Sequence, residues 1–155
     1  MKGKKCIYVF VTLFVTLLTG CHYDDDDYYD RLPWEIQKFI IQYYPNPTVD
    51  AVTESTDGWY VGLKSGPGFN FDTACQWTDV NGYGTTLPVV FVFDQFPEKL
   101  YDYLEETENT DNVFAVSRTP KEYRVRLLKS YLTYTINTET VTSELARQVT
   151  QNDSY

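Results

Sequence analysis

The chain has 155 residues, of which 43% are hydrophobic and 17% aromatic, and its formal net charge at pH 7 is −9. This length suits one domain and leaves no room for a large multidomain enzyme. The acidic balance argues against nucleic acid and anionic lipid headgroups as partners, because both would repel it. Histidine occurs once, so few catalytic schemes that depend on histidine can be built from this chain.

The first segment has the layout of a secretory signal peptide. A basic start at residues 1–5 is followed by an apolar run at residues 6–18 and then by small residues. As a helix this run would extend roughly 20 Å, short of the roughly 30 Å hydrocarbon core of a bilayer. We therefore predict a signal peptide over residues 1–20 rather than a permanent membrane span.

The junction Leu18-Thr19-Gly20-Cys21 resembles a bacterial lipobox. The resemblance implies cleavage before Cys21, lipid attachment to its thiol and acylation of its new amine, and several acyl chains anchor a protein stably. The alternative is an ordinary signal peptide with an accidental cysteine.

After lipidation Cys75 would stand alone in the mature chain, where no intramolecular disulfide could form. With no histidine nearby to lower its pKa, we expect Cys75 to be a bystander in a turn.

Residues 21–31 are predicted to be a hydrated acidic tether, because the five aspartates within residues 24–30 repel one another. Loss of the three lysines in residues 1–20 would move the net charge of the remaining chain from −9 to −12. The segment resembles the acidic surface-export tag of some gut-dwelling Gram-negative bacteria. That resemblance implies the outer face of the outer membrane, although a plain acidic spacer fits the same residues.

An internal repeat is the most informative feature of the sequence. The two copies are related by an offset of 64 residues, and the pattern continues with one single-residue loss. The matching segments are 32–40 with 96–104, 49–52 with 113–116, 59–63 with 123–127 and, after the loss, 69–71 with 132–134.

Each copy is predicted to open with a helix that turns one apolar stripe toward the core. The stripes follow the spacing i, i+3, i+4, i+7. They consist of Ile36, Phe39, Ile40 and Tyr43 in the first copy and of Leu100, Tyr103, Leu104 and Thr107 in the second. Pro33 and Pro97 are placed in the first helical turn, where a missing N–H loses no bond. The stripes contain no set of metal or cofactor ligands, so we expect them to be core.

Strand patterns follow each helix. Asp57-Gly58 predicts a hairpin turn, after which Trp59, Val61 and Leu63 share one face of a strand. The opposite face carries Tyr60, Gly62 and Lys64, and the matching positions of the second copy carry Arg124 and Arg126. Each copy should therefore contain a helix followed by three or four antiparallel strands.

These patterns predict an α+β fold, in which two tandem helix-plus-antiparallel-strand repeats form one continuous curved sheet with both helices on one face. We assign residues 32–86 to the first repeat, residues 87–142 to the second and residues 143–155 to a polar tail with a short helix from Ser143. Residues 87–93, between the copies, fit either a buried connector or an edge strand.

The pattern resembles the tandem PepSY-like family of bacterial envelope proteins over roughly residues 32–142. The matching elements include Leu32-Pro33, Tyr44-Pro45, Gly58-Trp59-Tyr60-Val61 and Phe71-Asp72, with counterparts in the second copy. The chain departs from the family at Cys75, where glycine is usual, and in the second copy, where the strand-turn glycines are missing. The resemblance implies a fold similar to that of the β-lactamase inhibitor protein, whose curved sheet can grip a partner, and it brings no catalytic or metal residues.

No catalytic, metal-binding or phosphate-binding motif is found in the sequence, so we predict a protein that is not an enzyme and needs no cofactor. The expected partner is an envelope or secreted protein, and the leading hypothesis is an envelope protease or hydrolase that the domain holds in check. The membrane is expected to be contacted through the lipid anchor alone. A glycan-binding module that uses Trp34, Trp59 or Trp77 is the alternative, and a structural component of an envelope complex is a third. Asp72-Thr73-Ala74 also resembles a short bacterial O-glycosylation motif.

The candidate partner-binding residues are Tyr60, Lys64, Arg124 and Arg126, which we expect on the face of the sheet that the helices leave open. Tyrosine and arginine are enriched at protein interfaces, and two arginines on alternate positions of a strand could meet a carboxylate-bearing partner. The competing interpretation is a solvated face whose arginines pair with neighbouring acids.

Overall fold

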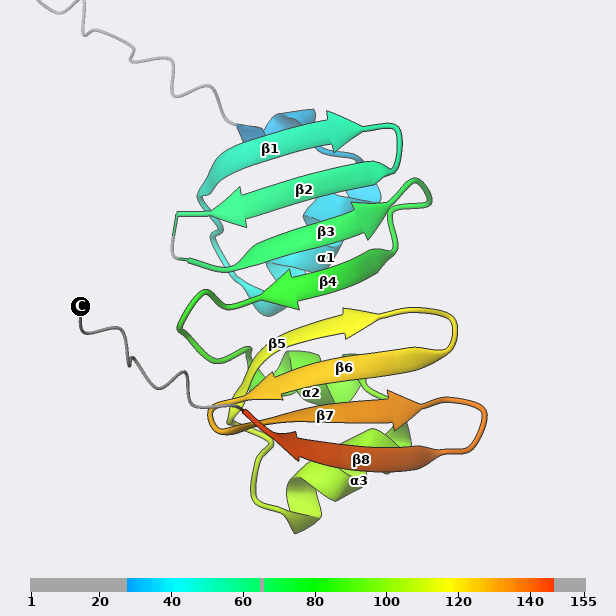
Figure 1. Ribbon diagram of the computed structural model, residues 1–155. Helices are drawn as coiled ribbons and strands as arrows, with labels where there is room; N and C mark the ends of the chain where they lie inside the picture. Colours follow the sequence, from blue (N-terminus) through cyan, green and yellow to red (C-terminus); the bar gives the residue numbers. More distant parts are fainter. Residues whose placement is uncertain (1–27, 65, 147–155) are drawn as a thin grey trace, which may run out of the picture.

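The computed structural model describes residues 28–64 and 66–146 and has the predicted α+β fold (Figure 1). Eight antiparallel strands form one sheet in which each strand neighbours the next along the chain. The helices lie together on one face of this sheet and leave the other face open (Figure 1). The elements are η1 (Tyr28–Arg31), α1 (Trp34–Tyr43), β1 (Val49–Ser55), β2 (Gly58–Leu63), β3 (Gly68–Asp72), β4 (Trp77–Asn81), α2 (Val89–Gln95), α3 (Glu98–Glu106), β5 (Val113–Arg118), β6 (Glu122–Leu127), β7 (Ser130–Thr135) and β8 (Thr140–Leu145).

The internal repeat is present in the structure. The elements α3, β5 and β6 begin 64 residues after α1, β1 and β2. Pro33 and Pro97 are the N-cap residues of α1 and α3, one position before the first turn, and have nearly equal backbone angles (φ −52° and −56°, ψ 142° for both). A register shift follows Val49 in β1 and, at the matching place, Val113 in β5. Each repeat therefore contributes a helix followed by four strands.

The core lies between the helices and the sheet face that they cover. The buried helical residues include Ile36, Ile40 and Tyr43 of α1 and Leu100 and Leu104 of α3. Alternate strand residues complete the core, and Val61 and Val125 are both 0% exposed. Thr107 is exposed because it is the C-cap residue of α3, so its predicted place in the core stripe is wrong.

The segment between the repeats, which fitted either a connector or an edge strand, is the helix α2. Phe91 and Val92 are its buried residues, with 1% and 0% of their surface exposed. The Phe91 ring makes edge contacts with the rings of Tyr43, Trp77 and Phe96. The connector therefore fills the core at the place where the two repeats meet.

Two expectations near the ends are corrected. β8 continues past residue 142 to Leu145, so the helix expected from Ser143 is wrong; threonine and valine favour a strand there, and β7 supplies its partner. Residues 28–31 of the predicted tether form η1, and the Tyr29 hydroxyl donates to the carbonyl oxygen of Gln37 at 3.0 Å.

The predicted signal peptide, the predicted lipidation site Cys21 and the aspartates at 24–27 lie outside the described residues. Across the described parts of the chain, the helices are all too short or too polar to cross a bilayer.

Candidate functional site on the open sheet face

The open face of the sheet carries two unbroken rows of residues that cross all eight strands. Each row joins residues that stand opposite one another from strand to strand, so neighbours in a row lie side by side. The first row is Thr53, Tyr60, Asn70, Asp79, Ser117, Arg124, Thr133 and Thr142. The second row is Ala51, Gly62, Gly68, Asn81, Ala115, Arg126, Tyr131 and Glu144.

The middle of both rows is the junction of the repeats, where β4 pairs with β5. Nδ2 of Asn70 donates to Oδ1 of Asp79 at 3.5 Å, and Nη2 of Arg126 donates to Oδ1 of Asn81 at 3.3 Å. Burial raises the pKa of Asp79, while the Asn70 hydrogen bond and the charge of Arg126 lower it. A partly buried carboxyl group of one repeat therefore lies near an arginine of the other.

Tyr60 lies over glycines of the second row. A Cβ atom on Gly68 would be 3.0 Å from the Tyr60 hydroxyl oxygen and 2.8 Å from Cε2 of Tyr83, so Gly68 leaves the space that both rings use. A hydrogen bond with Tyr83 raises the pKa of Tyr60, and burial raises it further. The first repeat therefore presents a pair of tyrosines, of which Tyr83 is 61% exposed.

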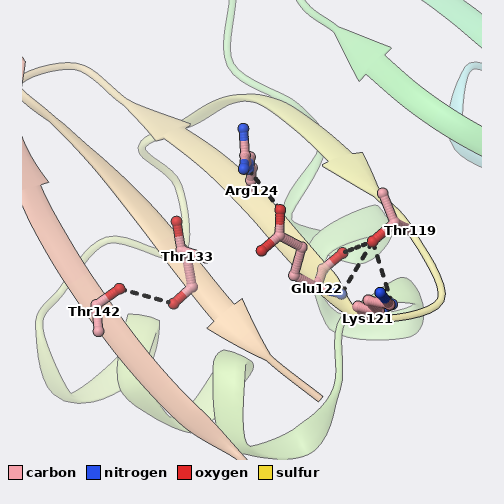
Figure 2. A network of polar contacts seen from close by, with 6 residues as sticks. All are labelled: Thr119, Lys121, Glu122, Arg124, Thr133 and Thr142. Carbon is pink, nitrogen blue, oxygen red and sulfur yellow. Dashed lines mark hydrogen bonds and ion pairs between the residues drawn. The ribbon is translucent and has the colours of Figure 1, made fainter. Parts of the chain in front are cut away.

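Arg124 is the charged residue that the second repeat contributes to the first row. Its Nε donates to Oε1 of Glu122 on the same strand at 2.8 Å, and 70% of the Arg124 side chain is exposed (Figure 2). Across β7 and β8, the Thr142 hydroxyl donates to the carbonyl oxygen of Thr133 at 3.4 Å (Figure 2). This end of the face is therefore polar and open, and its arginine pairs with a neighbouring acid, as the competing interpretation expected.

Lys64 lies apart from the other three candidates. It follows β2, and its backbone N–H donates to the carbonyl oxygen of Thr48 at 2.9 Å. With residues 43–48 it lines a hollow of about 460 Å³ at the end of α1. The structure thus brings Tyr60, Arg124 and Arg126 onto the two rows and places Lys64 at the end of the sheet.

Arg118 was missed by the sequence analysis and joins the two repeats. Its Nε donates to the carbonyl oxygen of Trp77 at 2.6 Å, and its guanidinium carbon lies 4.0 Å from the centre of the Trp77 ring. Nε1 of Trp77 donates to Oε1 of Gln95 at 2.7 Å, and Nε2 of Gln95 donates to the Tyr43 hydroxyl at 2.7 Å. At the 64-residue offset Arg118 aligns with an acid, Glu54, so the repeat offers no matching residue that would have pointed to this contact.

The tryptophans proposed for sugar stacking do not lie together on the open face. Trp77 is 2% exposed, Trp59 packs against the core, and Trp34, 69% exposed, belongs to α1.

Cys75 lies in the β3–β4 turn, as predicted, and burial raises the pKa of its thiol, so the thiolate is disfavoured. Thr73 of the same turn is exposed. Residues 28–64 and 66–146 contain no group of three or more histidine, cysteine, aspartate or glutamate side chains that could hold a metal ion.

No protein-family model and no curated protein matches the chain. Solved structures of the same fold come from Bacteroides species. A candidate periplasmic protein of the DUF2874 family from Bacteroides vulgatus matches with a TM-score of 0.65 and 21% identity, covering 77% of this chain and 93% of that chain.

Two further structures match similarly. A candidate calcium-regulated periplasmic protein from Bacteroides thetaiotaomicron has a TM-score of 0.61 and 21% identity, and covers 75% of this chain and 92% of its own. A candidate periplasmic protein of unknown function from Bacteroides vulgatus has a TM-score of 0.60 and 15% identity, and covers 74% of this chain and 93% of its own. At these identities the likeness concerns the fold: the chain is built like these Bacteroides proteins.

Proposed function

We propose that the protein is a non-catalytic lipoprotein of the bacterial envelope that binds a macromolecular partner through the open face of its sheet. The observation that carries this proposal is the pair of rows that cross all eight strands without interruption by a helix or loop. A face of this extent gives both repeats access to the same partner.

The charges of the face favour a partner that carries carboxylates. Arg124 is largely exposed and its ion pair with Glu122 is of the kind worth about 0.2–1 kcal/mol, so exchanging Glu122 for a partner's carboxylate costs little. Arg126 is held toward the junction by Asn81 and lies on the same side of β6. Together these arginines can form charge-assisted hydrogen bonds to an acidic surface.

We favour an envelope or secreted protein as the partner. More specifically, we favour a protease or hydrolase that this domain inhibits. This choice rests on the resemblance of the fold to an inhibitor, and fold alone does not fix function. Glycan binding is the second candidate, favoured by the exposed ring of Tyr83 beside Tyr60.

We further propose that lipid at Cys21 anchors the protein to the outer membrane with the domain at the cell surface. The periplasmic description of the structural neighbours supports an envelope location. Mass spectrometry of the membrane fraction tests the anchor, because a Cys21→Ser variant should lose the lipid mass and leave the membrane.

The partner is tested by a pull-down from envelope and secreted fractions of the host, with the non-lipidated chain from residue 22 as bait. An Arg124→Glu, Arg126→Glu bait runs beside it. The matched control, Lys38→Glu with Lys121→Glu, makes the same change in net charge away from the two rows. All baits are first compared by circular dichroism.

A protein retained by the unaltered and control baits and lost by the arginine bait would support the site. Equal capture by all three baits would refute the role of these arginines. If no protein is captured, saturable binding of sugars is measured next, and its loss in a Tyr60→Ala, Tyr83→Ala variant would favour the glycan function.

A further inference from the structure

The last strand, β8, is an edge of the sheet that is only partly protected, by the charge of Glu144 and by contacts with α3. It pairs with β7 on one side and is final in the strand order. Its residues Thr140–Leu145 include no proline, no lysine and no register shift, and Leu145 is 85% exposed. The opposite edge, β1, carries a register shift and is contacted by η1. Bulges and prolines are among the usual means of blocking an edge, and β8 has neither, so its outer side can accept a strand.

The register identifies the backbone groups that β8 turns outward. The N–H of Ala146 donates to the carbonyl oxygen of Lys129 at 2.9 Å, so Lys129 and Ala146 stand at a hydrogen-bonding position of the ladder. In antiparallel strands such pairs alternate with pairs that do not bond, and Glu144, Thr142 and Thr140 therefore also point to β7. The N–H and C=O groups of Val141, Ser143 and Leu145 point away from β7, toward the open edge.

A groove with acidic walls lies beside this edge. It has a volume of about 280 Å³ and runs between β8 and α3, which lies behind the edge of the sheet (Figure 1). Its lining residues are Lys99, Asp102, Tyr103, Glu106, Glu139 and Val141. Three carboxylates and one ammonium group give the lining a net negative charge, while Tyr103 and Val141 supply apolar contact.

We propose that the groove between β8 and α3 binds an extended peptide segment with lysine or arginine side chains, which adds to the sheet as a further strand. The outward backbone groups of Val141, Ser143 and Leu145 give such a strand its main-chain hydrogen bonds. Alternate side chains of the peptide point into the groove, where Asp102 and Glu106 select basic residues. This site adjoins the two rows, which end at Thr142 and Glu144 of β8, but it uses the outer side of that strand and does not depend on the arginines of the rows.

A second copy of the chain is a poorer occupant than a basic peptide. Pairing of two β8 edges would bring the two acidic grooves together, so that Asp102 and Glu106 would approach the same residues of the other copy. Like charges in an interface cost free energy, whereas a basic segment is attracted by them.

The test uses a library of random linear peptides displayed on phage and selected on the non-lipidated chain. Enriched peptides are synthesised with a fluorescent label, and their dissociation constants are measured by anisotropy. The informative variant is Ser143→Pro, which removes an outward N–H and leaves the ladder to β7 intact. Ser143→Ala is the matched control, because it changes the same side chain and keeps the N–H.

We expect the enriched peptides to carry lysine or arginine at alternate positions. Their binding should weaken about tenfold or more with Ser143→Pro and remain unchanged with Ser143→Ala. An Asp102→Lys, Glu106→Lys variant, which leaves β8 untouched, should also lose binding and so guards against a folding defect in the proline variant.

Failure to enrich any peptide would overturn the proposal, as would enriched peptides that bind Ser143→Pro as tightly as the unaltered chain. Sedimentation of the protein alone provides one further outcome. A dimer that dissociates with Ser143→Pro would replace the peptide with a second copy as the occupant of the edge.

Discussion

Arg118 offers the sharpest test of how the two repeats are held together. The ladder between β4 and β5 has three paired positions, against five in the ladder between β2 and β3. Arg118 reinforces this short ladder from β5, through its hydrogen bond to the Trp77 carbonyl oxygen and its position over the Trp77 ring. Arg118→Lys keeps the positive charge and removes both the donor at Nε and the planar group.

The expected cost can be assembled from these two contacts. A hydrogen bond from a charged donor contributes about 1.5 kcal/mol or more to stability, and a cation over an aromatic ring contributes about 0.5–1 kcal/mol. Lysine recovers part of the second contribution, so we expect a loss of about 2 kcal/mol. For a domain of this size that loss corresponds to a fall in Tm of about 8 °C.

Urea denaturation of the non-lipidated chain measures this loss, and Arg124→Lys is the matched control. Arg124 undergoes the same chemical change, but it is 70% exposed and pairs with Glu122, so its substitution should cost less than about 0.5 kcal/mol. Equal losses in the two variants, or a loss below about 0.5 kcal/mol for Arg118→Lys, would refute the account of Arg118 as a brace between the repeats.

Three further predictions test the turns and the open face. Gly58→Ala should lower the free energy of unfolding by about 3 kcal/mol, because its Cβ would overlap a carbonyl oxygen of β3. Gly84→Ala is the control, since Gly84 is also at positive φ but has open space around it, and it should lower the free energy of unfolding by about 1 kcal/mol. Urea denaturation measures both values. Tyr83→Phe should lower the pKa of Tyr60 toward 10.0, as followed by NMR titration, and an unchanged value would contradict the hydrogen bond. Burial raises the pKa of Asp79, so the unaltered chain loses stability as pH rises above 3.8 and this carboxyl group ionises. Asp79→Asn cannot ionise, so its stability relative to the unaltered chain should increase between about pH 3 and about pH 7. A difference that stays constant with pH would contradict this.

The elements that sequence reasoning predicts well are those whose burial pattern is repeated. Ile36 and Leu100 on the helices, and Val61 and Val125 on the strands, occupy matching positions and are 0% exposed. Two independent copies of one periodicity make the assignment secure, because a chance pattern would not recur at the same offset. The α+β fold with one sheet follows from these core positions.

The elements that were missed have no such pattern. The connector is a short run of apolar residues, which a buried strand and a short helix share, and its helical form depends on packing around Phe91. β8 is exposed along most of its length, so its sequence shows little alternation of apolar and polar residues. Residues 140–145 form a strand because they pair with β7. This pairing exists only in the folded chain and cannot be read from residues 140–145 alone.

The candidate sites lie where the two copies differ. At the 64-residue offset, Tyr60 aligns with Arg124 and Gly62 with Arg126, while the buried neighbour between them is valine in both copies. The inward positions are held alike by the demands of one core, whereas the outward positions are free to diverge, since little packing constrains them. A tyrosine pair over glycines in one half and two arginines in the other make the open face chemically asymmetric. Two identical repeats would present the same surface twice along the sheet, whereas this asymmetric face gives a partner that spans both repeats one position in which its contacts match.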